Sequence, residues 1–232
     1  MFIYGKNSVY EYLKKNKFVK TLYLDRNFND KCLISLIEKL NIQPHFYMKY
    51  ELDELAKGNH QGIIIDVGEY EYADLDDIIK DDHGFVIILD HLEDTHNFGA
   101  IIRTCTAAGV DGIIIPKDRS VSVNSTVMKT SVGSALNMKI CMVTNLNQTI
   151  KYLKDKNYWI YTSSMEGENY TNLDYTANVA LIIGNEGKGV SELVKKSSDF
   201  AISIPISEKV ESLNASVAAG IMIYEVIRKR SK

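Results

Sequence analysis

The sequence contains no long apolar run, and none of its apolar stretches approaches the ~20 residues that a membrane-spanning helix needs. Its opening residues, 1–6, lack the basic start and apolar stretch of a signal peptide. Internal repeats and low-complexity tracts are also missing. These absences exclude an integral membrane protein and a repeat protein. The 232 residues suit one large domain or two smaller domains of a cytoplasmic protein.

Cysteine is scarce, with only Cys32, Cys105 and Cys141. The three are far apart, odd in number and without metal-ligand spacing, so we expect reduced, buried thiols. His83, His91 and His96 fit no standard zinc pattern either. The sequence therefore predicts no disulfide framework and no metal site.

An excess of charge of one sign is lacking as well, because the net charge is −3. The acidic residues concentrate in residues 69–82, and the regions on either side are nearly neutral and slightly basic. This balance permits nucleic-acid binding through local patches but does not predict it. We expect a first domain over residues 1–68, an acidic linker over 69–82 and a second domain over 83–232.

Apolar periodicity and capping residues predict a small α/β domain at the N-terminus. The expected elements there are a helix from Asn7 or Ser8 to Lys15, a strand Val19–Leu24, a helix capped by Asp30 through Leu40, and strands Pro44–Tyr47 and Gly62–Val67. The aromatic residues Phe46, Tyr47 and Tyr50 can stack on RNA bases, but core or partly buried positions in a small domain are the favoured interpretation.

From Phe85 onward, strands and helices alternate, which predicts a mostly parallel sheet covered on both faces. The expected strands are Val86–Asp90, Ile113–Ile115, Lys139–Val143, Trp159–Thr162, Val179–Ile183 and Ile202–Ile204. The expected helices are Asn97–Ala108, Asn124–Ser131, Leu146–Lys154, a short helix capped by Ser191, and Asn214–Arg228. The basic tail 228–232 either touches phosphates or complements the helix dipole.

The first block that can carry chemistry, residues 90–103, runs from the carboxyl end of a strand into a helix. Ligands of open α/β sheets gather at that edge. Asn97 lies at or near the helix cap, and Arg103, six residues on, can reach the same edge with its long side chain. Taken alone, the alternative is a capping Asn97 and a surface Arg103.

The second block is Gly184-Asn185-Glu186-Gly187-Lys188-Gly189, a glycine loop delivered by an apolar strand. The glycine order differs from the Gly-x-Gly-x-x-Gly of a dinucleotide loop, and Lys188 is not followed by Ser or Thr as in a phosphate loop. The loop therefore indicates a small-molecule site. It disfavours, but leaves open, a nicotinamide-dependent oxidoreductase.

The third block is Ile204-Pro205, followed by Ser212-Leu213-Asn214-Ala215-Ser216 at the start of an alanine-rich helix. Capping and tight packing explain it when it stands alone. In order and spacing, however, the three blocks together resemble the SpoU family of TrmH-like RNA ribose 2′-O-methyltransferases, from about Val86 to Arg228.

This resemblance implies a trefoil-knotted α/β methyltransferase domain, a homodimer, and S-adenosylmethionine as the cofactor. It implies catalytic roles for Arg103, Asn97, Glu186, Asn214 and Ser212. It implies cofactor contacts for Thr162, Ser163, Gly184, Gly187, Ile204 and Leu213. An arginine base conflicts with a guanidinium pKa above ~12. We therefore expect Arg103 to grip the adjacent phosphate and stabilise the developing alkoxide, with Asn97, Glu186 and Asn214 orienting it.

Two N-terminal motifs, residues 4–9 (Tyr-Gly-Lys-Asn-Ser-Val) and 60–62 (His-Gln-Gly), are similar to the opening and close of a small RNA-binding domain in one branch of the family. This domain resembles the ribosomal protein L30e, and the branch includes the bacterial 23S rRNA guanosine-2′-O-methyltransferases. The resemblance implies 23S rRNA as the substrate. A tRNA guanosine methyltransferase, a thiazole-resistance methyltransferase acting on rRNA adenosine, and a non-catalytic RNA-binding assembly protein stay as alternatives.

Overall fold

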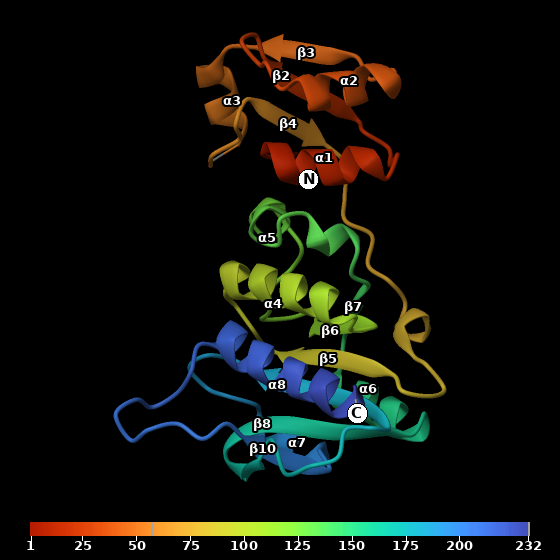
Figure 1. The fold of residues 1–232 in the computed structure, drawn as a ribbon, viewed down its shortest axis with the longest axis vertical. Coiled ribbons are helices and arrows are strands. Elements are labelled where there is room, and N and C mark those ends of the chain that lie inside the picture. Colours follow the sequence, from red (N-terminus) through yellow and green to blue (C-terminus); the bar gives the residue numbers. More distant parts are fainter. Residues whose placement is uncertain (57, 232) are drawn as a thin grey trace. The chain divides into compact units, whose positions relative to one another are not determined.

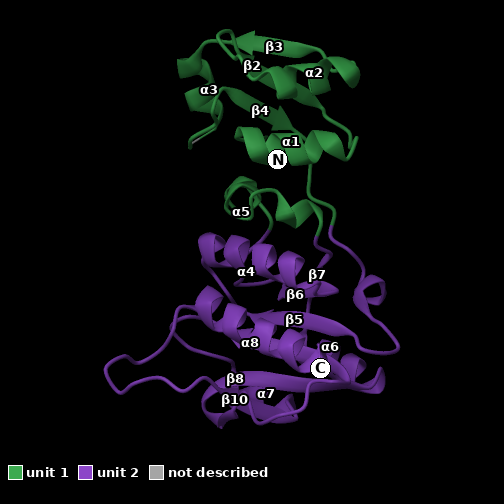
Figure 2. Ribbon diagram, viewed as in Figure 1, with its two compact units in different colours: residues 1–71, 123–137 green, residues 72–122, 138–232 purple. Residues whose placement is uncertain are grey.

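The chain folds into two compact units in the computed structural model, which describes residues 1–56 and 58–231 (Figures 1 and 2). Unit 1 comprises residues 1–71 together with 123–137, and unit 2 comprises residues 72–122 and 138–232. The division into domains at residues 69–82 stays a prediction. Lys57 and Lys232, the last residue of the expected basic tail, lie outside the described residues.

Unit 1 is built on a four-stranded sheet with the order β1-β4-β2-β3. Strands β1 and β2 run antiparallel to β4, and β3 runs parallel to β2. The elements are β1 (Phe2–Tyr4), α1 (Lys6–Lys14), β2 (Thr21–Asp25), α2 (Lys31–Lys39), β3 (Pro44–Tyr47), α3 (Lys49–Leu55), β4 (Ile63–Asp66), α5 (Ser125–Thr130) and the 3-10 helix η2 (Ser134–Leu136).

The core of unit 1 lies on both faces of its sheet, which explains the continuous apolar run of β4. Ile63 and Ile65 are fully buried on one face beside Leu22 and Leu24 of β2. Ile64 faces the other side and packs in a cluster that includes Leu52 of α3. The central strand β4 is thus buried on two sides, as a small two-sided core requires.

Three expectations for unit 1 need correction. The first helix is capped by neither Asn7 nor Ser8, because Gly5 (φ 88°) precedes it and Gln61 Oε1 accepts the Lys6 N–H at 2.9 Å. Strand β1 and helix α3 were not expected. Each is short, and α3 begins where the Glu51 carboxylate accepts the Met48 N–H at 2.6 Å.

The aromatic residues of β3 and α3 divide between core and surface. Tyr47 packs against the cluster around Leu52, as expected. The same expectation is wrong for Phe46 and Tyr50, which are 58% and 64% exposed. Phe46 alternates away from Tyr47 on β3, an edge strand with a neighbouring strand on one side only.

Unit 2 is built on a six-stranded sheet, order β10-β8-β9-β5-β6-β7, in which every neighbouring pair is parallel. The expected parallel α/β architecture is confirmed. The elements are η1 (Leu75–Ile78), β5 (Phe85–Asp90), α4 (Thr95–Ala108), β6 (Gly112–Pro116), β7 (Ile140–Val143), α6 (Leu146–Asp155), β8 (Tyr158–Asn169), β9 (Asn178–Gly184), α7 (Glu192–Ser197), β10 (Phe200–Ser203) and α8 (Ala215–Arg230).

Helices cover both faces of this sheet (Figure 1). Helices α4 and α8 pack together on one face, and α6, α7 and η1 contribute to the buried cluster on the other. All residues of β5 and β9 are buried, in agreement with their uninterrupted apolar sequences. Among the described residues, none of the helices combines the length and apolar content that crossing a bilayer requires.

The basic end of α8 has a structural role in the described residues. Arg230 donates to four backbone carbonyl groups, those of Tyr175, His83, Gly84 and Ala177, at 2.7–3.0 Å. Arg228 forms a two-pronged bond with the buried Glu225. The Arg230 contacts tie the C-terminal helix to the segments that precede β5 and β9, while the Arg228 pair lies within α8; both guanidinium groups are engaged.

Candidate active site

The topological switch point of the parallel sheet lies between β5 and β9. Strand β5 pairs on one side with β6, the next strand along the chain, and on the other side with β9. The last residues of the two central strands, Asp90 and Gly184, are register partners. Because ligands of open α/β sheets bind outside the carboxyl ends at this point, the loops that follow these two strands frame the candidate site.

Helix α4 begins two residues earlier than expected. Asp94 is its N-cap, and its carboxylate accepts the N–H groups of His96 and Asn97 at 2.7 and 2.8 Å. Asn97 therefore lies near the cap, in the first turn of the helix, but is not the cap itself. Because Asp94 already satisfies the helix end, the Asn97 side chain is available for other partners.

A chain of three hydrogen-bonded side chains joins the three sequence blocks. Asn97 Nδ2 donates to Glu186 Oε1 at 2.7 Å, and Asn214 Nδ2 donates to Asn97 Oδ1 at 3.0 Å. Asn214 is the N-cap of α8, where its Oδ1 accepts the Ser216 N–H at 3.0 Å. The carboxylate at one end and the backbone donor at the other fix the orientation of both amides.

An exchange of charge within this network tests its contribution to stability. The variant Asn97→Asp places a second carboxylate against Glu186, so we expect the free energy of unfolding to fall by about 1 kcal/mol. Adding Glu186→Gln restores a donor opposite the new carboxylate, while Asn214 keeps its bond. The double variant should therefore recover wild-type stability in chemical denaturation. A single variant as stable as the wild type would show that the network does not hold the loops together.

The glycine loop is shaped by backbone contact rather than by a phosphate-binding pattern. Gly189 (φ 67°) and Asn185 exchange two backbone hydrogen bonds at 2.9 and 3.1 Å. A Cβ on Gly184 would lie 2.3 Å from the Gly189 carbonyl carbon and 2.4 Å from the Val190 nitrogen. Only glycine fits at position 184, because the returning loop passes directly over it.

Two framework residues were missed by the sequence reasoning. The buried Asp90 accepts the Ser191 N–H at 2.7 Å and lies 2.5 Å from His91 Nδ1. Asn185 donates to the His91 carbonyl at 2.8 Å and accepts the Gly187 N–H at 2.9 Å. Together they fasten the glycine loop to the end of β5. A carboxylate that ends a wholly apolar strand was the available sequence signal for Asp90.

A cavity of about 760 Å³ lies beside the glycine loop. Five segments line it: residues 163–166 of β8, the glycine loop with the end of β9, the start of α7, the residues after β10, and the first half of α8. Of the expected site residues, those that line it are Ser163, Gly184, Glu186, Gly187, Ile204, Ser212 and Leu213. Its volume suits a ligand of cofactor size. At its rim, Lys195 donates to Glu192 at 3.0 Å and holds the pKa of that carboxyl below its ordinary value.

Four expected residues do not line this cavity: Thr162, Asn97, Asn214 and Arg103. Asn97 and Asn214 are linked to it through Glu186. Thr162 is buried one residue before Ser163, and its hydroxyl is the one buried side-chain polar atom in the described part of the chain that lacks a hydrogen-bond partner. The expected contact of Thr162 with the cofactor stays a prediction.

Arg103 is exposed on α4, six residues beyond Asn97. Within residues 1–56 and 58–231 it forms no hydrogen bond or ion pair, and the structure does not connect it to Asn97 or Glu186. Its expected catalytic role stays a prediction.

The histidines form no metal centre with the groups around them. His91 pairs with Asp90, and His83 Nδ1 contacts the Thr176 carbonyl at 2.7 Å. In the described ranges, no group of three or more His, Cys, Asp or Glu side chains is arranged to hold a metal ion.

Comparisons with known proteins identify this arrangement. Residues 84–224 match the family model described as SpoU rRNA methylase, and residues 2–73 match the one described as RNA 2′-O ribose methyltransferase substrate binding. The chain is 41% identical over 239 residues to YacO of Bacillus subtilis (strain 168), assigned by name to the TrmH family of tRNA/rRNA methyltransferases. That match covers 99% of this chain and 96% of YacO.

Solved structures share the fold over the whole chain. The SpoU methyltransferase AviRb from Streptomyces viridochromogenes, in complex with the cofactor AdoMet, has a TM-score of 0.87 and 23% identity, covering 100% of this chain and 90% of that one. The AdoMet-bound rRNA methyltransferase from Sinorhizobium meliloti has a TM-score of 0.83 and 24% identity, with coverage of 98% and 86%.

The family matches and the shared fold, which is of the trefoil-knot class, identify an S-adenosylmethionine-dependent RNA 2′-O-methyltransferase. The chain belongs to the SpoU rRNA methylase family. The expected family, fold, enzyme class and cofactor are confirmed. These findings exclude the oxidoreductase and the non-catalytic assembly protein.

Proposed function

We propose that this enzyme transfers a methyl group from S-adenosylmethionine to the ribose 2′-hydroxyl of a guanosine in 23S rRNA, as a cytoplasmic homodimer. The observation that carries the proposal is the hydrogen-bonded chain of Asn97, Glu186 and Asn214, whose carboxylate end lines the cofactor-sized cavity. The match of residues 2–73 to an RNA substrate-binding domain and the rRNA named for the Sinorhizobium enzyme support the ribosomal substrate.

The loops and strand segments around the cavity bind the cofactor, mainly through their backbone groups. We assign contacts to Ser163, Gly184, Ile204 and Leu213, which line it, and to the unsatisfied hydroxyl of Thr162. Gly187 lines the same wall. When bound, S-adenosylmethionine supplies a sulfonium methyl group that an oxygen nucleophile attacks in line, so positioning provides much of the rate.

The polar network positions the RNA. Glu186 belongs to both the cavity and the network, and Ser212 lies on the same wall, so both are placed to orient the ribose. Arg103 is assigned to the phosphate next to the target ribose and to the charge that develops on the 2′-oxygen. A guanidinium stays protonated and is therefore a clamp and an electrostatic stabiliser rather than a base.

A homodimer accounts for the isolated position of Arg103. Helix α8 presents Val217 and Tyr224, 50% and 51% exposed, and Gly220 of α8 lies against Thr104, the neighbour of Arg103 on α4. These exposed apolar residues of α8, the helix that packs against α4, are suited to a second copy of the chain. In such a dimer, Arg103 of one protomer serves the network of the other.

Co-expression of two inactive variants tests this arrangement. If Arg103 acts across the interface, each mixed dimer of an Arg103→Ala chain and a Glu186→Gln chain contains one intact site, and the mixed dimers should show about half of wild-type activity. If both residues act within one chain, mixed dimers stay inactive. Differently tagged chains, purified through both tags, give the population to assay.

Mapping of ribose methylation in rRNA and tRNA, with and without this protein, tests the substrate. Loss of one guanosine mark in 23S rRNA supports the proposal. Loss of a tRNA mark, or of an rRNA adenosine mark, overturns the guanosine assignment and favours the corresponding alternative.

A further inference from the structure

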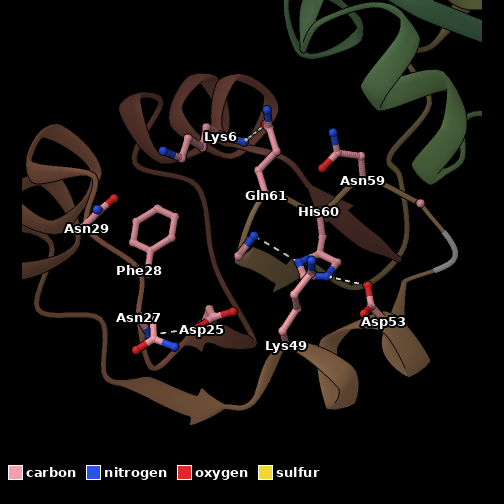
Figure 3. Close-up of a pocket in the computed structure, with 12 residues that line it drawn as sticks. Lys6, Asp25, Asn27, Phe28, Asn29, Lys49, Asp53, Asn59, His60 and Gln61 are labelled. Atoms are coloured by element: carbon pink, nitrogen blue, oxygen red, sulfur yellow. Dashed lines mark hydrogen bonds and ion pairs between the residues drawn. The ribbon is translucent and has the colours of Figure 1, made fainter.

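Unit 1 contains a cavity of about 650 Å³ that the methyl-transfer site does not use. It is bounded by the loop after β2, the starts of α1 and α3, and residues 58–62 (Figure 3). The two N-terminal motifs meet at this cavity. Gly5 N donates to the Ile63 carbonyl at 3.3 Å, and Gln61 Oε1 accepts the Lys6 N–H at 2.9 Å. The volume is that of a small-molecule site.

The loop on one side of the cavity is held in a strained conformation. Gln61 has a φ of 53°, in the left-handed region that residues with a side chain rarely adopt. The buried His60 fixes this loop with both ring nitrogens: Nδ1 accepts the Gly62 N–H at 3.0 Å, so Nε2 carries the hydrogen and donates to Asp53 at 2.9 Å. Strain of this kind concentrates at ligand-binding sites.

The cavity wall combines three chemical groups. The half-buried ring of Phe28 is its apolar part, and the exposed amides of Asn27, Asn29 and Asn59 offer donors and acceptors (Figure 3). Lys49 adds a cation that forms no ion pair with any described residue. An aromatic wall stacks a base, amides read its edge, and a lysine binds its phosphate.

The acidic groups of the cavity are already engaged. Asp25 Oδ1 accepts the Asn27 N–H at 2.8 Å, and Asp53 accepts the histidine proton. Lys6 lies 3.2 Å from Asp30 and 5.4 Å from the centre of the Phe28 ring. Each aspartate thus has one oxygen committed to the protein, and the uncommitted donors of the wall are its asparagine amides and Lys49, which suit a base edge and an anionic phosphate.

We propose that this cavity binds one unpaired nucleotide of the substrate RNA, with its base on Phe28, its edge on the asparagine amides and its phosphate on Lys49. The inference rests on the proposed function, since it names how the N-terminal unit recognises the RNA. It gives the two N-terminal motifs a shared role: they build a nucleotide subsite remote in sequence from the methyl-transfer residues.

Filter binding of the full-length protein to a 23S rRNA transcript, at one fixed salt concentration, tests the subsite. Phe28→Leu keeps the apolar volume but removes the π face, and we expect the Kd to rise at least about fivefold. Lys49→Ala should raise it similarly. In methyl transfer, both variants should raise KM for RNA and leave kcat unchanged, while calorimetric affinity for S-adenosylmethionine stays at the wild-type value.

Two matched variants in the same unit serve as controls. Phe18→Leu changes an exposed aromatic ring of unit 1 that does not line the cavity, and Lys39→Ala removes an exposed cation at the end of α2. Neither should change the Kd more than about twofold. Wild-type RNA affinity in Phe28→Leu and Lys49→Ala would overturn the subsite, and so would an equal loss in both controls.

Failure of the subsite and failure of the proposed substrate are distinguishable. If the wild type methylates 23S rRNA and Phe28→Leu binds it equally well, the subsite is wrong and the substrate stands. If the wild type binds and methylates only a tRNA transcript, the same variants are measured with that transcript. A loss of affinity there supports the subsite without the ribosomal substrate.

Discussion

Replacing Arg103 by lysine is expected to lower methyl-transfer turnover by about 100-fold or more. Lysine keeps the positive charge but loses the planar fork of donors that grips a phosphate in two places. Arg103 is exposed and lies outside the cofactor cavity, so its replacement should leave protein stability and affinity for S-adenosylmethionine unchanged. Single-turnover assays and calorimetry measure the two effects separately.

The control for this substitution is Arg119→Lys, which changes another exposed arginine of unit 2. It should keep turnover close to the wild-type value. Near-normal turnover in Arg103→Lys would remove Arg103 from the centre of the mechanism. An equal loss in both arginine variants would indicate general electrostatic attraction of RNA in place of a specific clamp.

Replacing Gly184 by alanine should abolish cofactor binding and destabilise the protein. The new methyl group would lie 2.3–2.4 Å from backbone atoms of Gly189 and Val190, which cannot move aside as a flexible side chain can. We expect the free energy of unfolding to fall by about 3 kcal/mol, which corresponds to a drop in Tm of about 6–12 °C. Thermal unfolding and calorimetry with S-adenosylmethionine measure both losses.

Gly187→Ala is the matched control in the same loop. A Cβ there meets only Asn185 Oδ1, at an ordinary distance of 3.6 Å, and the Gly187 backbone is not in the left-handed region. Its Tm should stay within about 2 °C of the wild type. Equal destabilisation by the two alanines would show that the loop does not pass over Gly184 as described.

The parallel sheet and the candidate site were largely predictable, because both rest on local signals. Buried parallel strands such as β5 and β9 are uninterrupted apolar runs, and the three blocks follow strand ends or precede helices. The sequence could not show that Asp94, and not Asn97, caps α4. Both residue types favour a cap, and the choice depends on where the chain leaves β5.

Other features of the structure depend on contacts between distant segments. The bond from Asn97 to Glu186 spans 89 positions, and the bond from Asn214 to Asn97 spans 117. No periodicity encodes such pairings; the order of the blocks indicated them only through the family resemblance. The sequence did not predict strand β1 or helix α3, because their three and seven residues are too few to show a hydrophobic periodicity. The cavity beside Phe28 depends on a left-handed Gln61, which sequence patterns do not reveal.

Nucleoside analysis of RNA methylated in vitro tests the central claim most directly. Purified protein is incubated with methyl-labelled S-adenosylmethionine and a 23S rRNA transcript, and the RNA is digested to nucleosides. We predict that the label appears in 2′-O-methylguanosine. When the Glu186→Gln variant replaces the wild-type protein in the same assay, we predict no labelled nucleoside. Label on a base, or equal 2′-O-methylation by the Glu186→Gln variant, would contradict the account.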